Sequence, residues 1–278
     1  MDLRIDHVAF GWSDRSEIVG HLERLGLDPE CGGTHRDGTT AMSLVGFDDG
    51  TYLELIGPAG EEPPARWQTV IESDAGPAAW AVRVDDVAET AKTLIDRGLQ
   101  AHGPVQDHRE RPDGVRVEWD HCTFGGPSAR RVYPFAIADR TPRSYRVAPS
   151  PSVANTALRG IAEVVLAVED LDAVIPRFKR RFRFPDPLRR THDSFEARLA
   201  HFPGQPVTLA EPAGSSWLRS RLASVGRGPA SVLLVTDDMG EVRRDFPVEI
   251  EERWFGRRLA RFDSERLGFR LGVVEREE

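Results

Sequence analysis

The chain has 278 residues, a length that suits two domains of about 140 residues each. Its hydrophobic fraction of 40% and charged fraction of 29% are typical of a globular protein, and they exclude a disordered or collagen-like chain. The formal net charge of −8 argues against nucleic acid or an anionic membrane surface as the main partner.

The sequence carries no targeting or membrane signal. No run approaches 18 apolar residues, so no transmembrane span is expected. The N-terminal segment MDLRIDHVAF lacks the basic and apolar regions of a secretion signal. Cys31 and Cys122 are the only cysteines. Together these features predict a reduced, cytoplasmic setting.

The first 60 residues predict one strand, one helix and three further strands. Residues 3–12 alternate as a strand, and residues 15–25 repeat apolar side chains at helical spacing before Gly26, where a C-terminal cap belongs. Three strand-like segments separated by Asp-Gly turns follow, at 31–35, 40–47 and 51–56.

The same order of elements then begins again. A strand is predicted at 78–84 and a helix at 87–97, ending at Gly98. Further strands are expected near 102–106, 115–124 and 131–138. The second half repeats the scheme twice more, with a short last helix near 239–245. The chain therefore contains four βαβββ modules.

Two segment pairs align without gaps between the two halves of the chain. GTYLELIGPAG (50–60) aligns with GQPVTLAEPAG (204–214), and GPAAWAVRVDDV (76–87) with GPASVLLVTDDM (228–239). The offsets of about 154 and 152 residues predict an ancient duplication. We expect one unit at 1–146, a Pro/Ser-rich linker at 147–157 and a second unit at 158–278. The fold class is α+β, with two paired-module units, each a curved mixed sheet backed by helices around a cleft.

This arrangement resembles the vicinal oxygen chelate superfamily, and most closely its glyoxalase-like family. The resemblance rests on IDHVAFGWSD (5–14), GGTHRDGTTAMSLVGFDDGTYLELIGP (32–58), WAVRVDD (80–86) and PFAIADRTPR (134–143). The superfamily includes isomerases, lyases, extradiol dioxygenases and drug-binding proteins, so the fold leaves the reaction open.

The resemblance implies a metal site at the cleft floor of the first unit. Metal-using members take ligands from the first and last strands of a module, and His7 and Glu54 match those positions. Imidazole and carboxylate suit Zn, Ni, Mn or Fe, with open positions for substrate oxygens. The alternative is a buried His7 hydrogen-bonded to Glu54 without a metal. In the second half, Glu163 and Thr208 replace this pair, so any site is expected in the first unit alone.

Further candidates surround this pair. Glu54 and Glu118 are the predicted catalytic carboxylates, and Glu118 is preferred over His121, which lies on the opposite face of the same strand. His35 is a candidate substrate or metal contact. The predicted apolar lining of the pocket, for which core packing is the alternative, comes from four aromatic residues: Trp80, Trp119, Tyr133 and Phe135.

The preferred interpretation is an enzyme, a lyase, isomerase or dioxygenase that acts on a small oxygenated metabolite through a divalent metal. The alternative is a metal-free protein that binds or sequesters a small molecule, and a weaker one is an interaction scaffold. No phosphate-binding fingerprint is present, so no nucleotide cofactor is expected. The expected partner is a small molecule, without nucleic acid or membrane, and the chain is expected to be a monomer or homodimer.

Overall fold

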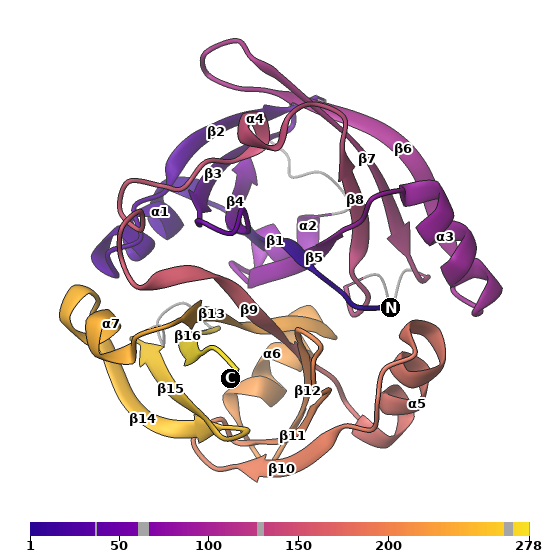
Figure 1. The fold of residues 1–278 in the computed structure, drawn as a ribbon, viewed down its shortest axis with the longest axis vertical. Coiled ribbons are helices and arrows are strands. Elements are labelled where there is room, and N and C mark those ends of the chain that lie inside the picture. The colour runs from indigo at the N-terminus through magenta and orange to yellow at the C-terminus, as the bar shows by residue number, and fades with distance from the viewer. Residues whose placement is uncertain (37, 61–66, 127–130, 264–268, 278) are drawn as a thin grey trace.

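The structure is a computed structural model that describes residues 1–36, 38–60, 67–126, 131–263 and 269–277. Two units lie side by side, the first in indigo to magenta and the second in orange to yellow (Figure 1). Each contains two βαβββ modules, and the predicted α+β fold with duplicated modules is confirmed. No helix among the described residues is long and apolar enough to cross a membrane.

The eight strands of the first unit form a closed barrel in the order β1-β4-β3-β2-β6-β7-β8-β5. β1 (Ile5–Gly11) runs parallel to β4 (Tyr52–Pro58) and antiparallel to β5 (Gly76–Arg83). β5 in turn runs parallel to β8. The remaining strands are β2 (Glu30–His35), β3 (Thr40–Gly46), β6 (Ala101–Glu110), β7 (Arg116–Phe124) and β8 (Phe135–Asp139).

The barrel closes where the two modules meet at their outer strands. β2 and β6 pair at only two positions, Thr34 with Glu110 and His35 with Arg109. The sequence predicts a curved sheet with a concave cleft, and the closure turns the concave face of this sheet into the interior of a barrel. A closed sheet leaves no exposed strand edge.

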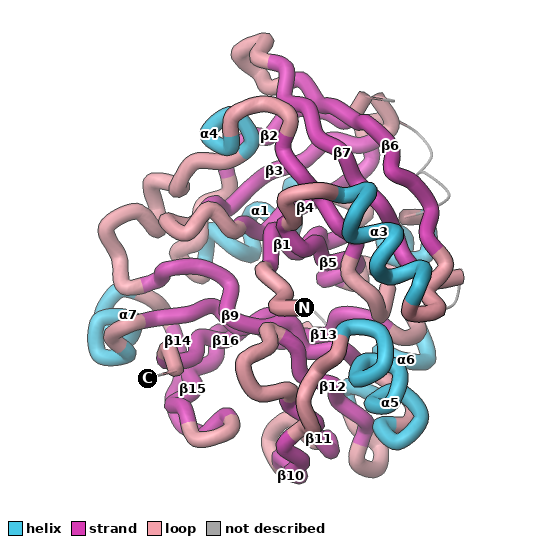
Figure 2. The backbone as a smooth tube through the Cα atoms, turned by 45° about the vertical axis from the view of Figure 1, so that its right-hand side comes forward, coloured by secondary structure: helices cyan, strands magenta, loops and turns pink. Residues whose placement is uncertain are grey.

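The two long helices of the first unit lie outside its strands (Figure 1 and Figure 2). α1 (Arg15–Arg24) and α3 (Val87–Asp96) begin at Asp14 and Asp86, whose carboxylates accept hydrogen bonds from the first-turn amides. Gly26, with a φ of +79°, follows α1 as the sequence predicts. The sequence did not predict the short helices α2 (Gln68–Glu72) and α4 (Arg143–Arg146), because a single helical turn carries no apolar periodicity.

The second unit repeats this topology without closing. Its strands lie in the order β10-β11-β12-β9-β13-β16-β15-β14, and the described edges β10 and β14 do not pair. The strands are β9 (Leu158–Ala167), β10 (Leu188–His192), β11 (Ala197–His201), β12 (Val207–Pro212), β13 (Gly228–Thr236), β14 (Val248–Trp254), β15 (Arg257–Phe262) and β16 (Arg270–Glu275). The helices are α5 (Leu171–Phe182), α6 (Trp217–Val225), which was not predicted, and α7 (Met239–Asp245).

The two units share one hydrophobic core. Phe10 of β1 meets Phe269 of the second unit at 5.2 Å between ring centroids, and Tyr133 contacts the Phe178 and Phe182 rings of α5. Gly76, at the start of β5, has a φ of +68°, and a Cβ there would lie 2.3 Å from the Phe269 ring. Because glycine alone allows this approach, the two units pack closely at the base of β5.

Residues 147–157, the predicted linker, connect α4 to β9 and pack against the barrel. The Gly46 amide donates to Ser150 Oγ at 3.1 Å, and the Ser150 amide donates to the Gly46 carbonyl at 3.0 Å. Val147, Ser150 and Val153 are buried. The segment therefore forms part of the first unit's surface layer.

Candidate functional site

A cavity of about 210 Å³ lies inside the barrel of the first unit. Its described lining comes from both modules, with residues from β1, β2, β4, β5, β6, β7 and β8. Histidines, a glutamate and arginines share this lining with aromatic and small apolar side chains. Such a mixture of an apolar wall and a few polar groups is typical of a small-molecule site.

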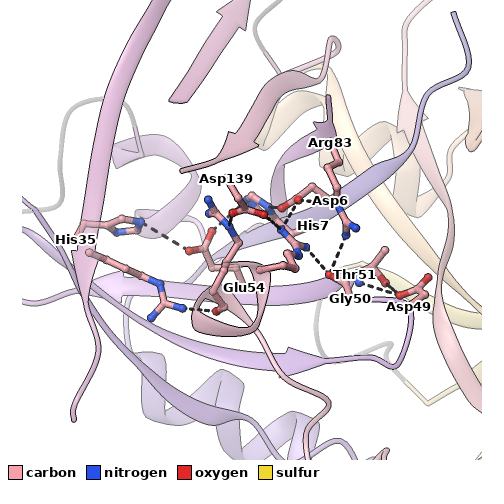
Figure 3. A network of polar contacts seen from close by, with 12 residues as sticks. Asp6, His7, His35, Asp49, Gly50, Thr51, Glu54, Arg83 and Asp139 are labelled. Atoms are coloured by element: carbon pink, nitrogen blue, oxygen red, sulfur yellow. Dashed lines mark hydrogen bonds and ion pairs between the residues drawn. The ribbon is translucent and has the colours of Figure 1, made fainter. Parts of the chain in front are cut away.

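Four polar side chains form a row on one side of the cavity (Figure 3). His7 Nδ1 lies 2.7 Å from Asp6 Oδ1, and His7 Nε2 lies 3.5 Å from Glu54 Oε2. On the other side of the same carboxylate, His35 Nε2 lies 3.7 Å from Glu54 Oε1. His35 Nδ1 contacts Thr40 Oγ1 at 2.7 Å. Glu54 therefore lies between two imidazoles whose other nitrogens contact Asp6 of β1 itself and Thr40 of β3.

The row depends on an irregularity in β1. The pairing of β1 with β5 shifts register between Ile5 and His7, so Asp6 lies beside His7 rather than on the opposite face. Asp6 is 1% exposed and also contacts Arg143 Nη1 at 2.6 Å and Arg83 Nε at 3.4 Å. Burial would raise the pKa of Asp6, but the His7 hydrogen bond and the nearby positive charges outweigh it and hold this pKa well below its usual range.

Aromatic rings hold the His7 imidazole in place. Tyr52 stacks on it with centroids 4.6 Å apart, and Phe135 meets it edge-on at 5.3 Å. Burial raises the pKa of the Tyr52 phenol, which therefore stays neutral. The rotation of His7 is thus fixed by packing as well as by Asp6.

Three arginines line the cavity. Arg146 stacks over Trp119 at 4.6 Å and forms an ion pair with Asp139. Arg109 donates to the backbone carbonyls of Gly32 and Arg146. Arg131 donates to the Ala78 carbonyl at 3.0 Å and to the carbonyl of Val225 in the second unit. Burial lowers the pKa of Arg109, and it lowers that of Arg131 to about 10.

The structure brings five of the predicted site residues to this cavity: His7, His35, Glu54, Trp119 and Phe135. His7 comes from the first strand of the first module and Glu54 from the last, and these strands are parallel neighbours. The predicted first-unit location thus coincides with the cavity, although the roles of these residues remain predictions.

Three predicted residues lie elsewhere, and their expected roles are corrected. Glu118 does not line the cavity: on β7 it points away from the interior and pairs with Arg116 at 2.9 Å. Its neighbour His121, on the inward face of β7, lines the cavity instead. Trp80 is fully buried in the shared core and donates to the Val132 carbonyl. Tyr133 packs on α5, where the Arg181 guanidinium bonds its hydroxyl.

Sequence reasoning missed the arginines, Tyr52 and Asp6. With only two lysines among 37 basic residues, arginine is so frequent here that no single one stands out. Strand alternation placed Asp6 on the face opposite His7, since a register shift is invisible in one sequence. Tyr52 did carry a usable signal, because it lies two residues before Glu54 on the same face of β4.

The donor set matches a metal site only in part. His7 and Glu54 offer imidazole and carboxylate donors of the kind that divalent metals take. Among the described residues, however, no three His, Cys, Asp or Glu side chains are grouped so that they could hold one ion. Resident metals in proteins generally take three or more protein ligands.

The second unit fills the equivalent space with its own side chains. Glu163, at the position of His7, is 1% exposed and accepts hydrogen bonds from Thr208, from Trp254 Nε1 at 2.9 Å and from Arg257 Nη2 at 2.7 Å. His201 Nδ1 also lies 3.5 Å from this carboxylate. Trp254 is fully buried, so its ring occupies the interior of the open sheet. The predicted pair is absent from this copy, and a polar core stands in its place.

Comparisons with solved structures support the same fold across the whole chain. A hypothetical protein from Staphylococcus aureus has a TM-score of 0.64 at 12% identity, covering 99% of this chain and 100% of that one. A variant of 4-hydroxymandelate synthase from Streptomyces coelicolor has a TM-score of 0.63 at 16% identity, covering 100% and 93%. A fusion of a xylose isomerase-like TIM barrel with 4-hydroxyphenylpyruvate dioxygenase has a TM-score of 0.62 at 15% identity. This chain spans only 49% of that protein, while all of this chain is covered.

These identities are low, and the likeness is one of fold alone. No curated protein matches the sequence. The sequence itself matches the family described as glyoxalase-like domain over residues 5–182, which includes all of the first unit and the first helix of the second. The chain therefore belongs to the glyoxalase-like domain family.

Proposed function

We propose that this protein is a glyoxalase-like enzyme that acts on a small oxygenated molecule in the first unit's cavity, with Glu54 as the group that moves a proton. The observation that carries the proposal is the row Asp6–His7–Glu54–His35, of which the last three residues line the cavity. An isolated buried glutamate would be ordinary, but one placed between two oriented imidazoles is suited to acid–base chemistry.

The orientation of His7 follows from the charge of Asp6. The lowered pKa keeps Asp6 ionised, so its carboxylate only accepts, and His7 Nδ1 must donate to it. A neutral His7 then presents the lone pair of Nε2 to the carboxylate of Glu54. Two acceptors that face each other at 3.5 Å need a positive charge between them, and a proton on Nε2 supplies it.

This pair can hold and transfer one proton. With the proton on His7, Glu54 is a carboxylate able to accept a proton from a carbon next to a carbonyl group of the substrate. His35 Nε2 lies 3.7 Å from the other oxygen of this carboxylate, and the Arg109 guanidinium lies nearby. Returning the proton to the other face of the same carbon or to another atom gives isomerase chemistry, one of the classes that the sequence suggests.

Instead of a proton, a divalent metal could lie between His7 Nε2 and the Glu54 carboxylate. Such a metal would polarise substrate oxygens. His35 lies at the other oxygen of Glu54, but among the described residues no three His, Cys, Asp or Glu side chains are grouped so that they could hold one ion, so the donor set does not fit a resident ion as it stands. The proposed steps therefore use the proton alone, and the metal enters as an arm of the test.

The alternative function is a metal-free binding protein. The observation that favours it is the lining of Trp119, Phe135 and Tyr52, which gives a ligand apolar contact without assigning it a reaction. The two functions differ in what Glu54 does: an enzyme needs its carboxylate, whereas a binding protein tolerates its amide isostere.

Hydrogen–deuterium exchange at carbon tests the proposal. Small 2-oxo acids, their amides and hydroxy ketones are incubated in D₂O with the protein, and the C–H signals are followed by proton NMR. Exchange is expected with wild type and is expected to fall by roughly 100-fold or more in Glu54→Gln. Glu118→Gln is the matched control, because this glutamate lies outside the cavity and its loss is expected to change nothing.

Metal dependence is measured on the same material. Protein purified without chelators or an affinity tag is analysed for metals, and exchange is repeated after dialysis against EDTA. Exchange that survives dialysis supports the proton mechanism. Exchange lost with EDTA and restored by zinc, nickel, manganese or ferrous ion would replace it with metal catalysis. If no compound exchanges but Glu54→Gln still binds small molecules, the binding function takes its place.

A further inference from the structure

Arg131 lies in the cavity wall. Among the described residues, no carboxylate forms an ion pair with it, and it donates instead to the carbonyls of Ala78 and Val225. Its third nitrogen, Nη2, is enclosed and has no hydrogen-bond partner in that part of the chain. The same side chain lines the cavity that contains His7 and Glu54.

A neighbouring arginine shows what a purely structural guanidinium looks like here. Arg221 of α6 is 5% exposed and lies at the same interface between the units. It donates to the carbonyls of Ala75, Pro77 and Pro229, so both of its terminal nitrogens and Nε are used. It does not line the cavity. Arg131 ties the units together in the same way but keeps one donor unused.

Of the other two arginines that line the cavity, Arg109 donates both terminal nitrogens to the carbonyls of Gly32 and Arg146, and Arg146 is paired with a carboxylate. Arg146 pairs with Asp139, and nearby Arg143 pairs with both Asp6 and Asp139. Arg131 has no such carboxylate among the described residues, and burial lowers its pKa only to about 10, so it carries its charge at neutral pH. A buried, uncompensated cation is unfavourable, and an anion that enters the cavity removes the penalty.

We propose that Arg131 binds a carboxylate of the ligand, so that the molecules this cavity accepts are small organic acids. This inference rests on the proposed function, which it makes more specific. A planar guanidinium with a free N–H matches a carboxylate oxygen better than it matches a neutral carbonyl. Trp67, Val70 and Phe135 provide the apolar wall for the rest of the molecule. The carboxylate then directs the remainder of the acid toward Glu54.

The second unit takes part in this recognition. Val225, whose carbonyl holds Arg131 Nη1, is the last residue of α6. Arg221 fixes the backbone of Ala75 and Pro77, which leads into the cavity-lining Ala78 and Ala79 of β5. The second unit, which lacks the His7–Glu54 pair, therefore helps to position Arg131, the proposed anion-binding residue of the first unit.

The test compares benzoate with benzamide, which have the same shape but differ in charge. Binding to wild type, Arg131→Gln, Arg131→Lys and Arg221→Gln is measured by isothermal titration calorimetry at pH 7, with thermal unfolding as the folding control. Wild type is expected to prefer benzoate by about tenfold or more. Arg131→Gln is expected to lose the preference, and Arg131→Lys to retain part of it. Arg221→Gln is expected to unfold at lower temperature yet retain the preference.

The outcomes separate this inference from the proposed function. Wild type that binds benzamide as tightly as benzoate, or binds neither, overturns the inference without requiring any variant to fold. A benzoate preference that persists in folded Arg131→Gln overturns the inference as well. If Arg221→Gln loses the preference to the same extent as Arg131→Gln, the effect comes from the interface between the two units, and the inference is again overturned. Exchange that fails while the benzoate preference holds would refute only the proton chemistry.

Discussion

Replacing Asp6 by asparagine removes the one buried carboxylate that orients His7. The perturbation keeps the shape and one acceptor oxygen but removes the charge that faces His7, Arg143 and Arg83. Breaking a buried charge pair costs about 3–5 kcal/mol. Here Arg143 keeps Asp139 and Arg83 is about one-third exposed, so a loss of about 2–3 kcal/mol in the free energy of unfolding is expected.

The pH dependence gives a second, independent measure. The pKa of Asp6 is depressed in the folded state, so its stabilising contribution is present above the unfolded value of 3.8 and is lost as the pH falls toward the folded value. Between pH 6 and pH 3 the wild type is therefore expected to lose about 1 kcal/mol through this one group. The variant lacks the group, so its stability is expected to fall less steeply over the same range.

Urea denaturation followed by tryptophan fluorescence at several pH values provides the assay. Asp120→Asn is the matched control, since Asp120 is paired with Arg140 at 2.9 Å on the surface and is expected to contribute less than about 1 kcal/mol. If Asp6→Asn and wild type lose stability in parallel down to pH 3, the assignment of Asp6 as a buried, ionised anchor is refuted.

Three further substitutions probe other parts of the molecule. Glu163→Gln leaves the Arg257 guanidinium with Glu277, 3.9 Å away, as its described carboxylate partner and is expected to cost about 2–3 kcal/mol in urea denaturation while benzoate affinity is unchanged; altered affinity would show that this polar core influences the first unit's cavity. Gly76→Ala is expected to lower the unfolding free energy by about 2 kcal/mol or more, because a Cβ there meets the Phe269 ring in a left-handed backbone; unchanged stability would show that the units do not pack as described. Trp119→Ala removes the ring on which the Arg146 guanidinium stacks, and with it part of the cavity wall. The substitution is expected to lower the unfolding free energy by about 2–4 kcal/mol and to weaken benzoate binding in calorimetry. Unaltered binding would place the ligand elsewhere.

The fold could be predicted well because its strands, helices and repeats leave local, periodic patterns in the sequence. Strand alternation, helix caps such as Asp14 and Asp86, and the repeat offsets all report local geometry, and the structure has these elements at nearly the expected bounds. Closure of the first barrel was not predictable, because pairing of β2 with β6 joins residues about 75 positions apart and leaves no local pattern.

The site was predictable only where a residue type is rare. His7, His35 and Glu54 are predicted as potential ligands because imidazole and carboxylate groups lie on predicted strands, and all three line the cavity. For Glu118 and His121, alternation showed that they face opposite sides of β7 but not which side is the interior. For Trp80 and Tyr133 the sequence left both a pocket and a core open, with core packing as the alternative to the pocket, and both residues lie in the core that the two units share.

The narrow closure of the barrel bears on how a molecule enters it. β2 and β6 are joined by two residue pairs, whereas neighbouring strands such as β6 and β7 pair along most of their length. One of the two pairs contains His35, so the seam lies beside the reactive row. A seam this short can separate while every other strand pair stays intact, and amide hydrogens of Thr34 and His35 would then exchange with solvent sooner than those of β3 or β7. The two modules meet along two lines, β1 with β5 and β2 with β6, and the duplicated architecture thus confines the flexibility of the barrel to the shorter of them.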